Sequence, residues 1–390
     1  MRITIRERRA RLARGHALAP RARAAGALDA ARAVVALHSS DPISVYLSTR
    51  ARMRRPTVAA VERALYEERS LVRALGMRRT MFVVPRETFP LMHHGCAAPL
   101  GPAERRRTAR MIEEAGLVAD GMRWLRRAER AAVEALADLG EATAKQLSGA
   151  VPLLAKRIAY GEGRRWAGEM GVVTRVLFLL STEGRVLRAR PLGSWISGQY
   201  RWALTETWLG EPTPDVPAEE ARAKLVRRWL EAFGPGTLTD LRWWTGWTLA
   251  QVRAALATVG AIEVQLEGST GWLLPDDLSP VRDPAPWAAL LPGLDPTVMG
   301  WKEREWYLGE HGPALFDRNG NAGPTVWWDG RVVGGWVHRP DGEVAYRLLE
   351  DVGSDAETAI DAEAGRLQAW LGETRVIPRF RTPLEVELFR

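Results

Sequence analysis

The sequence contains one cysteine, Cys96, among 390 residues. A single thiol excludes an intramolecular disulfide and any zinc site built from several cysteines. Lysine is almost as scarce, with Lys145, Lys156, Lys224 and Lys302 as its four occurrences. No run of about eighteen apolar residues is available to span a bilayer, and no early apolar segment resembles a signal peptide. We therefore expect a cytoplasmic protein without a membrane partner.

The charge that is present is mostly arginine. Lys+Arg number 55 against 47 Asp+Glu, for a formal net charge of +8. Basic residues gather in residues 6–25 and 104–110, which contain few acidic residues. Arginine forms forked contacts with phosphates, so such runs suit a polyanion such as nucleic acid, although a solvated surface has the same composition. A chain of this length is too long for one hydrophobic core, so we expect two to four domains.

A similar unit occurs at least twice. Residues 125–190 and 219–275 each begin with a helix that stops at glycine, followed by a short helix that opens at Thr143 or Thr237. Each unit then has a further helical segment and closes on a two-stranded ribbon, predicted in "RVLFLLSTEGRVLRAR" (175–190) and "AIEVQLEGSTGWLLP" (261–275). Three helices followed by a ribbon is the winged-helix plan.

The rest of the chain gives a third unit and a different ending. Helices in "LDAARAVVAL" and "TVAAVERALYEERSLV" and a strand after Gly76 in "ALGMRRTMFVVP" suggest a looser winged-helix unit at the N-terminus. After a proline-rich linker at 275–287 come strands with hairpins at Asp-Gly 329–330 and 341–342, a strand in "TRVIPRF" and a helix in "DAETAIDAEAGRLQAWLG". We predict an α+β fold with tandem winged-helix units and a C-terminal β-barrel-like domain. The predicted segments are 1–120, 121–212, 213–282 and 283–390.

The β-rich end is expected to pack on the helical units. It is too small to bury so many tryptophans alone. These are Trp287, Trp301, Trp306, Trp327, Trp328 and Trp336.

The stretch "LHSSDP" (37–42) places a histidine and a hydroxyl between two predicted helices. One interpretation is structural: Ser40 or Asp41 caps the next helix, Pro42 takes its first position, and His38 is a polar residue at a helix end. The other interpretation is catalytic and depends on the resemblance described below.

Other chemical signatures are weak. His93, His94 and Cys96 lack a second ligand pair at a spacing typical of zinc. No G-x-S-x-G elbow supports a catalytic triad, and the glycine-rich "RNGNAG" (318–323) precedes a strand and not a helix. We expect no metal, no nucleotide cofactor and no other cofactor.

The order of "LHSSDP", "RRTMFVVP", "GPGTLTDLRWWTGW", "LLPGLDPTVMGWKERE" and "GPTVWWDGRVVGGW" resembles the bacterial winged-helix DNA glycosylases of the AlkZ/YcaQ type, from about residue 25 to 375. The resemblance implies a C-shaped fold around a positively lined channel that holds double-stranded DNA. It also implies excision of bulky N-alkylated purines, in DNA repair or antibiotic self-resistance. The family's catalytic signature, Gln-x-Gln or Gln-x-Asp, aligns with His38-Ser39-Ser40, so both signature positions are substituted here.

The chemistry tolerates this substitution. A purine alkylated at N7 already carries positive charge, so its glycosidic bond breaks without a general acid. We predict that His38 accepts a proton from the attacking water, Ser40 orients that water, and Asp41 stabilises developing positive charge. No lysine lies near this stretch, so we expect a monofunctional hydrolase. Predicted DNA contacts are Arg50, Arg52, Arg54, Arg55, Arg185, Arg188 and Arg190.

A non-catalytic winged-helix protein that binds DNA, such as a regulator or lesion sensor, is the alternative. A regulator that reads two half-sites would be a dimer. Three winged units in one chain instead predict a monomer that surrounds DNA by itself.

Overall fold

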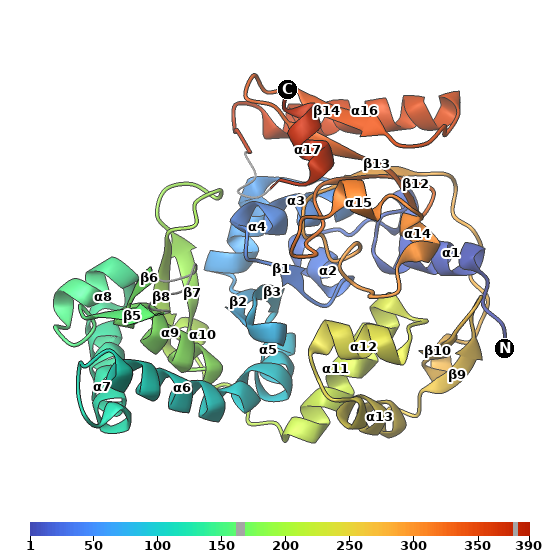
Figure 1. Cartoon of the computed structure of the whole chain (residues 1–390). Coiled ribbons are helices and arrows are strands. Elements are labelled where there is room, and N and C mark those ends of the chain that lie inside the picture. The colour runs from blue at the N-terminus through green and yellow to red at the C-terminus, as the bar shows by residue number, and fades with distance from the viewer. Residues whose placement is uncertain (161–167, 377–380) are drawn as a thin grey trace. The chain divides into compact units, whose positions relative to one another are not determined.

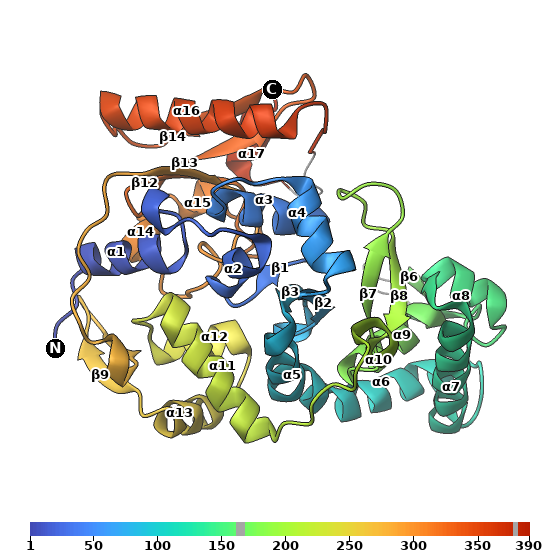
Figure 2. The same ribbon diagram turned by 180° about the vertical axis from the view of Figure 1, so that it is seen from behind.

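The computed structural model describes residues 1–160, 168–376 and 381–390. The chain divides into two compact units (Figures 1 and 2). Unit 1 comprises Met1–Leu71, Phe82–Pro85 and Ala223–Arg390, and unit 2 comprises Val72–Met81 and Arg86–Arg222. This division differs from the four predicted segments, because residues 1–120 are shared between the two units.

Unit 2 is built around three packed helices. Its elements are β2 (Leu71–Leu75), η3 (Met77–Arg79), η4 (Arg86–Thr88), α5 (Phe89–Met92), η5 (His93–Ala97), η6 (Ala98–Leu100), α6 (Gly101–Glu114), α7 (Gly121–Leu139), β4 (Glu141–Thr143), α8 (Ala144–Ala150), β5 (Arg157–Tyr160), β6 (Gly168–Gly171), α9 (Val172–Thr182), β7 (Val186–Pro191), β8 (Tyr200–Leu204) and α10 (Thr205–Leu209). Helices α6, α7 and α9 contact one another (Figure 1). Along α7, Trp124, Leu125, Ala128, Ala132 and Leu136 recur every three or four positions and form its buried face.

The helix starts and stops of this unit follow the predicted signals. Thr143 caps α8 in a capping box with Gln146, and α7 ends at Gly140, whose φ is +71°. The ribbon predicted at 175–190 was wrong in its first half, because Val172–Thr182 is helix α9. A continuous apolar run does not distinguish a buried strand from a buried helix by periodicity. The observed antiparallel sheet has the order β4-β8-β7.

Unit 1 combines the chain's N-terminal and C-terminal parts. Its N-terminal elements are α1 (Ile5–Gly15), η1 (Pro20–Ala22), α2 (Ala27–Arg32), β1 (Leu37–His38), α3 (Pro42–Arg52), α4 (Val58–Glu62), η2 (Arg63–Glu67) and most of β3 (Met81–Pro85). Next come most of α11 (Ala218–Phe233), then α12 (Leu238–Thr245), α13 (Leu249–Thr258), β9 (Ile262–Gln265) and β10 (Thr270–Leu273). These last five elements follow the predicted order of three helices and a ribbon, and Thr237 caps α12 as expected.

The C-terminal part of unit 1 holds a four-stranded antiparallel sheet. Its elements are η7 (Pro275–Asp277), β11 (Ala288–Leu291), α14 (Glu305–Leu308), α15 (Gly312–Leu315), β12 (Thr325–Trp328), β13 (Arg331–His338), β14 (Val344–Leu348), α16 (Ser354–Leu371) and α17 (Pro383–Leu388). The strands lie in sequence order, with β11 and β14 at the edges of the sheet. The sequence predicts a barrel-like domain for this part of the chain. Helix α16 contacts β11, β12 and β14, and α17 contacts β13.

Turn chemistry explains the hairpins of this sheet. Asp329 and Gly330 have φ values of 45° and 83°, as the tight turn between β12 and β13 requires. Gly342, with φ of 101°, turns the chain between β13 and β14. Both predicted Asp-Gly hairpins are therefore confirmed. Of the strand predicted at 374–380, residues 377–380 lie outside the described residues and 374–376 form no strand.

The N-terminal segment is bound to the C-terminal part by buried polar contacts. His16, which is fully buried, lies 2.9 Å from the Thr297 hydroxyl and stacks on Trp301. The Trp301 indole N–H donates to the Phe233 carbonyl of α11 at 3.1 Å. The expectation that the β-rich end packs on other parts of the chain is therefore confirmed.

Candidate functional site

The stretch from His38 to Asp41 joins β1 to α3 within unit 1. Strand β1 pairs antiparallel with β3, and His38 lies opposite Phe82. The two rings meet edge to face, with centroids 5.3 Å apart and an interplanar angle of 70°. The imidazole is therefore held against an apolar ring and remains half-buried at the end of a short strand.

Asp41, and not Ser40, caps helix α3. Its carboxylate accepts a hydrogen bond from the Ile43 N–H at 3.2 Å, and Pro42 takes the first helical position. Burial raises the pKa of Asp41, while the hydrogen bond from Ile43 opposes the rise. The structural interpretation of this residue therefore holds, and the cap places a partly buried carboxyl beside His38 and Ser40.

A backbone hydrogen bond selects the tautomer of neutral His38. The Ser40 N–H donates to His38 Nδ1 at a long 3.4 Å. A neutral imidazole that accepts at Nδ1 carries its proton on Nε2. Nδ1 is then the basic nitrogen of this stretch. The Ser40 side chain is exposed, whereas the Ser39 hydroxyl is fully buried without a hydrogen-bond partner among the described residues.

Two of the arginines predicted to contact DNA are interior residues. Arg50 Nη1 lies 2.5 Å from Glu363 Oε1, and Arg52 forms a forked pair with Asp295 at 2.7 and 2.8 Å. The Arg50 and Arg52 side chains are 6% and 0% exposed. Guanidinium groups that are buried against carboxylates cannot reach a phosphate, so the prediction for these two residues is corrected.

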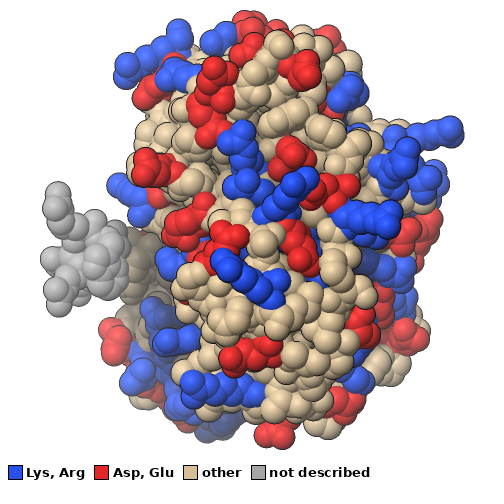
Figure 3. Space-filling view, turned by 90° about the vertical axis from the view of Figure 1, so that its right-hand side faces the viewer, with Lys and Arg blue, Asp and Glu red and all other residues tan. Residues whose placement is uncertain are grey.

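The other predicted contacts are nearer the surface. Arg54 and Arg55 follow α3 and are exposed, as is Arg185 at the start of β7, while Arg190 is half-buried. Figure 3 shows the side of the molecule that carries α1 and the 278–287 segment in Figure 1. Positive and negative side chains are interspersed on this face, so it is no uniformly cationic surface.

Arg188 lies in a cluster of rings and arginines on the sheet of unit 2. Its guanidinium stands 5.1 Å from the Tyr200 ring and 5.2 Å from the Trp202 ring. Arg73 covers the same Tyr200 ring at 4.4 Å. Burial and the nearby Arg73 lower the pKa of Arg188 to about 10, so it stays protonated at neutral pH. Arg188 Nε is buried without a hydrogen-bond partner among the described residues.

The aromatic partners of Arg188 were not predicted. Arg188 and Trp202 lie directly opposite each other across β7 and β8, and Tyr200 is two residues from Trp202 on the same face. The alternation of side chains along β7 and β8 places Arg188, Tyr200 and Trp202 on one face. The predicted ribbon covers residues 175–190 and does not include β8, so the two rings are absent from the prediction. The rings hold the guanidinium in place without neutralising it.

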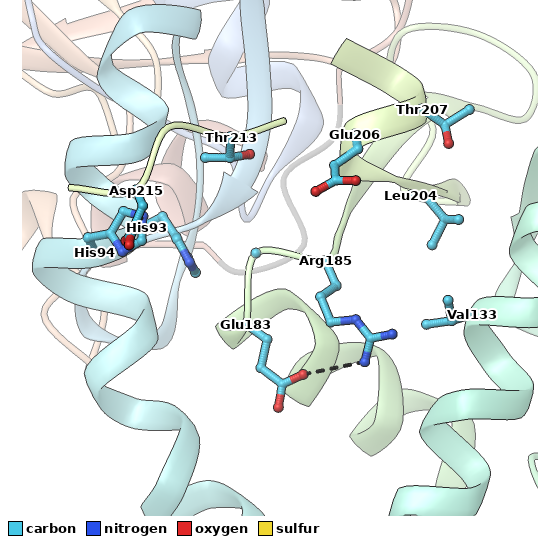
Figure 4. Close-up of a pocket in the computed structure, with 11 residues that line it drawn as sticks. His93, His94, Val133, Glu183, Arg185, Leu204, Glu206, Thr207, Thr213 and Asp215 are labelled. Atoms are coloured by element: carbon cyan, nitrogen blue, oxygen red, sulfur yellow. Dashed lines mark ion pairs between the residues drawn. The ribbon is translucent and has the colours of Figure 1, made fainter. Parts of the chain in front are cut away.

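Unit 2 also contains a polar cavity of about 370 Å³. Figure 4 shows His93, His94, Thr213 and Asp215 on one side of it and Glu206 and Thr207 on another. The dashed line in the figure joins Arg185 Nη1 to Glu183 Oε2, 3.8 Å apart. Glu183 is also paired with Arg105, so the acid that faces Arg185 already has a second cation.

His93 is the buried titratable group of this cavity. Burial and the neighbouring His94 lower its pKa to about 4, although Asp215 opposes the shift. Its ring packs against Gly184, where an added Cβ would lie 2.8 Å from Nε2. His93 is therefore neutral at physiological pH. The cavity brings together no nucleophile and base in hydrogen-bond contact among the described residues, so it gives no catalytic pair.

The described ranges, residues 1–160, 168–376 and 381–390, contain no metal-binding cluster and no helix that could span a membrane. No group of three or more His, Cys, Asp or Glu side chains there could hold a metal ion. None of the helices in these ranges is both long and apolar enough to cross a membrane.

Comparisons with known proteins agree on one family. The fold is similar to that of the Streptomyces sahachiroi DNA glycosylase AlkZ, with a TM-score of 0.74 and 20% sequence identity over 96% of this chain and 99% of that one. No curated protein sequence matches. The family described as DNA glycosylase AlkZ-like matches residues 31–370, and that range includes the His38 stretch, the sheet of unit 2 and the four-stranded sheet. The chain therefore belongs to the AlkZ-like DNA glycosylase family.

Proposed function

We propose that this protein is a monofunctional DNA glycosylase that hydrolyses the N-glycosidic bond of bulky N-alkylated purines. The observation that carries the proposal is the family match over residues 31–370. The proposed role is DNA repair or self-resistance of an antibiotic producer. The proposed organisation is three winged-helix units, two of which are α7–α9 with the β4-β8-β7 sheet and α11–α13 with β9 and β10.

The proposed catalytic groups are His38, Ser40 and Asp41. His38 Nδ1 accepts a proton from a water that attacks C1′ of the damaged nucleotide. The hydrogen bond from the Ser40 N–H to this nitrogen is 3.4 Å long, and a water that approaches Nδ1 competes with it. The Phe82 ring limits rotation of the imidazole, which reduces the entropy lost in positioning the water.

Asp41 is proposed to provide charge stabilisation. The Ile43 N–H donates to its Oδ1, and the other carboxylate oxygen is available for the positive charge that develops on the sugar. The exposed Ser40 hydroxyl is proposed to orient the water. The leaving base needs no proton when it is alkylated at N7, so the site does not need an acid.

Duplex DNA is proposed to bind through Arg54, Arg55, Arg185, Arg188 and Arg190, independently of sequence. Contacts between cations and phosphates release counterions, so the logarithm of affinity falls by about 0.9 per contact for each tenfold rise in salt. A salt slope near zero would contradict DNA binding through these residues.

The direct test is incubation with a duplex that contains one N7-alkylated guanine, followed by alkali, which cleaves abasic sites. We expect strand cleavage at the adduct with wild-type protein, and much less with His38→Ala at equal duplex occupancy. Wild-type protein that binds the duplex but releases no base would contradict the enzyme proposal. That result would support a non-catalytic DNA-binding protein. Light scattering in solution separates the two further, because the glycosylase is proposed to be a monomer and a regulator that reads two half-sites a dimer.

A further inference from the structure

The arginines of the N-terminal basic run, residues 6–25, differ in what they contact. Arg6 pairs with Asp283 at 2.5 Å, and Arg11 pairs with Asp277 at 2.8 Å. Arg9 donates to the Trp306 carbonyl at 2.6 Å. These three therefore serve the fold of unit 1.

Two arginines of the same run have no such contact. Arg14 at the end of α1 and Arg21 in η1 are exposed, and neither has an ion pair with any residue that the structure describes. Both line one open cavity of about 890 Å³, together with Arg282. Arg282, which lies in the segment between η7 and β11, is likewise exposed and has no carboxylate partner in the described part of the chain.

Each acidic residue that lines this cavity forms an ion pair with an arginine. Asp283 and Asp277 are held by Arg6 and Arg11 as described above. The third, Glu231, lies 3.0 Å from Arg227 one turn before it on α11. Figure 3 shows the side of the molecule that carries α1, where Lys/Arg and Asp/Glu side chains lie next to one another. Each acid that lines the cavity is paired with an arginine, and two of these arginines, Arg11 and Arg227, pair with a second acid as well. Arg14, Arg21 and Arg282 have no carboxylate partner among the described residues.

The shape of the cavity fits a ligand of nucleotide size. Its volume lies within the range of small-molecule sites. Small residues form much of the wall, including Gly15, Ala19, Ala22 and Gly234, so a ligand can approach the backbone closely. Three guanidinium groups around such a space match an anion of two or more charges, and guanidinium binds phosphate oxygens with two parallel hydrogen bonds.

We propose that this cavity binds a phosphate-bearing ligand, with Arg14, Arg21 and Arg282 as its cationic groups. The phosphate can come from a free nucleotide or from the sugar–phosphate backbone of DNA outside the damaged nucleotide. The site is separate from the His38 stretch and does not depend on glycosylase activity.

The test is calorimetric titration of the full-length protein with pyrophosphate and with AMP, at constant ionic strength set with chloride. Single Arg14→Gln, Arg21→Gln and Arg282→Gln variants are compared with Arg318→Gln. Arg318 is an exposed arginine of unit 1 that does not line the cavity. Each cavity variant should weaken binding roughly tenfold, because one charge-assisted hydrogen-bonding group is lost. Arg318→Gln should bind as wild type, and thermal melting without ligand should be unchanged in all four.

The second arm measures the affinity of a short unmodified duplex against salt. The combined variant carries all three cavity substitutions. If it lowers the salt slope of duplex binding by up to about three, and wild-type protein binds pyrophosphate and AMP weakly, the DNA backbone is the source of the phosphate. If small phosphates bind tightly and duplex affinity does not change, the ligand is a free nucleotide. The proposal is overturned if wild-type protein binds neither small phosphate at millimolar concentration and the combined variant has the wild-type slope. Base excision is not measured, so its absence would leave this result unaffected.

Discussion

Replacement of Arg52 by methionine should destabilise unit 1 strongly and affect DNA affinity little. Arg52 and Asp295 are both fully buried, and the forked pair is supported by hydrogen bonds from Arg52 to the Ser48 carbonyl and the Thr297 hydroxyl, each 2.7 Å long. Methionine fills a similar volume but leaves the Asp295 carboxylate without its cation. The loss of one partner of a buried pair costs about 3–5 kcal/mol.

The assay is thermal unfolding followed by tryptophan fluorescence. For a unit of this size, 3–5 kcal/mol corresponds to a fall in Tm of roughly 6–20 °C. Arg54→Met, two positions further along the chain and exposed, is the matched control and should change Tm by less than about 2 °C. In a duplex titration below both melting temperatures, Arg54→Met should weaken binding and Arg52→Met should not.

The pH dependence of this effect follows from Asp295. Burial alone would raise the pKa of Asp295, but Arg52 and the hydrogen bond from the Thr297 N–H outweigh it and lower that pKa. In wild type this carboxyl therefore adds stability above its unfolded pKa, and that stability is lost as pH falls. Without Arg52, burial raises the pKa of Asp295, so the carboxyl is easily protonated in acid. The difference between variant and wild type should be largest near neutral pH and shrink as pH approaches 4.

Asp295→Asn provides the decisive second variant. An amide in place of the carboxylate removes the buried negative charge, so Arg52→Met/Asp295→Asn should be more stable than Arg52→Met alone. The assignment of Arg52 to the interior would be refuted by a wild-type Tm for Arg52→Met together with a loss of duplex affinity equal to that of Arg54→Met.

His38→Ala should slow single-turnover excision by roughly 10²–10⁴-fold with little change in duplex affinity, whereas His38→Gln, which restores one residue of the family signature, should retain activity. Excision by His38→Ala at the wild-type rate would exclude His38 as the base. Arg188→Gln should lower by about one the slope of the logarithm of duplex affinity against the logarithm of salt concentration. Arg201→Gln, on the same sheet and with Arg201 lying 3.7 Å from Glu141, should leave this slope unchanged. Equal slopes in the two variants would contradict a phosphate contact at Arg188. Burial lowers the pKa of His93 from 6.5 to about 4, so the unfolded chain takes up the proton first as pH falls. The free energy of unfolding should therefore fall by about 1.5 kcal/mol from this residue between pH 6.5 and 5. His93→Phe should show a correspondingly smaller loss in urea unfolding at the two pH values.

Local signals predicted helix boundaries better than they predicted strands. The Thr143 and Thr237 hydroxyls accept hydrogen bonds from backbone N–H groups three residues further along the chain. Their capping role can therefore be predicted from the local sequence. The two Asp-Gly turns are equally local. The apolar run at 172–182 is different, because it is buried on most of its surface and shows no alternation that separates helix from strand. Its misassignment moved the ribbon and concealed Tyr200 and Trp202 as neighbours of Arg188.

The arginines show why a site is harder to predict than a fold. Arg52 and Arg54 are two residues apart and equally basic in the sequence, yet one is fully buried and the other exposed. What separates them is Asp295, which lies 243 positions further along the chain and reaches Arg52 only because the C-terminal part folds back onto α3. A guanidinium that the fold buries against a carboxylate cannot reach DNA, and whether this happens depends on partners distant in sequence. The same rule separates Arg11 from Arg14 on one helix. Of the seven arginines in the basic run at 6–25, Arg6, Arg11 and Arg23 form ion pairs with carboxylates, whereas Arg14 and Arg21 form none with the described residues, a distinction that only the folded chain reveals.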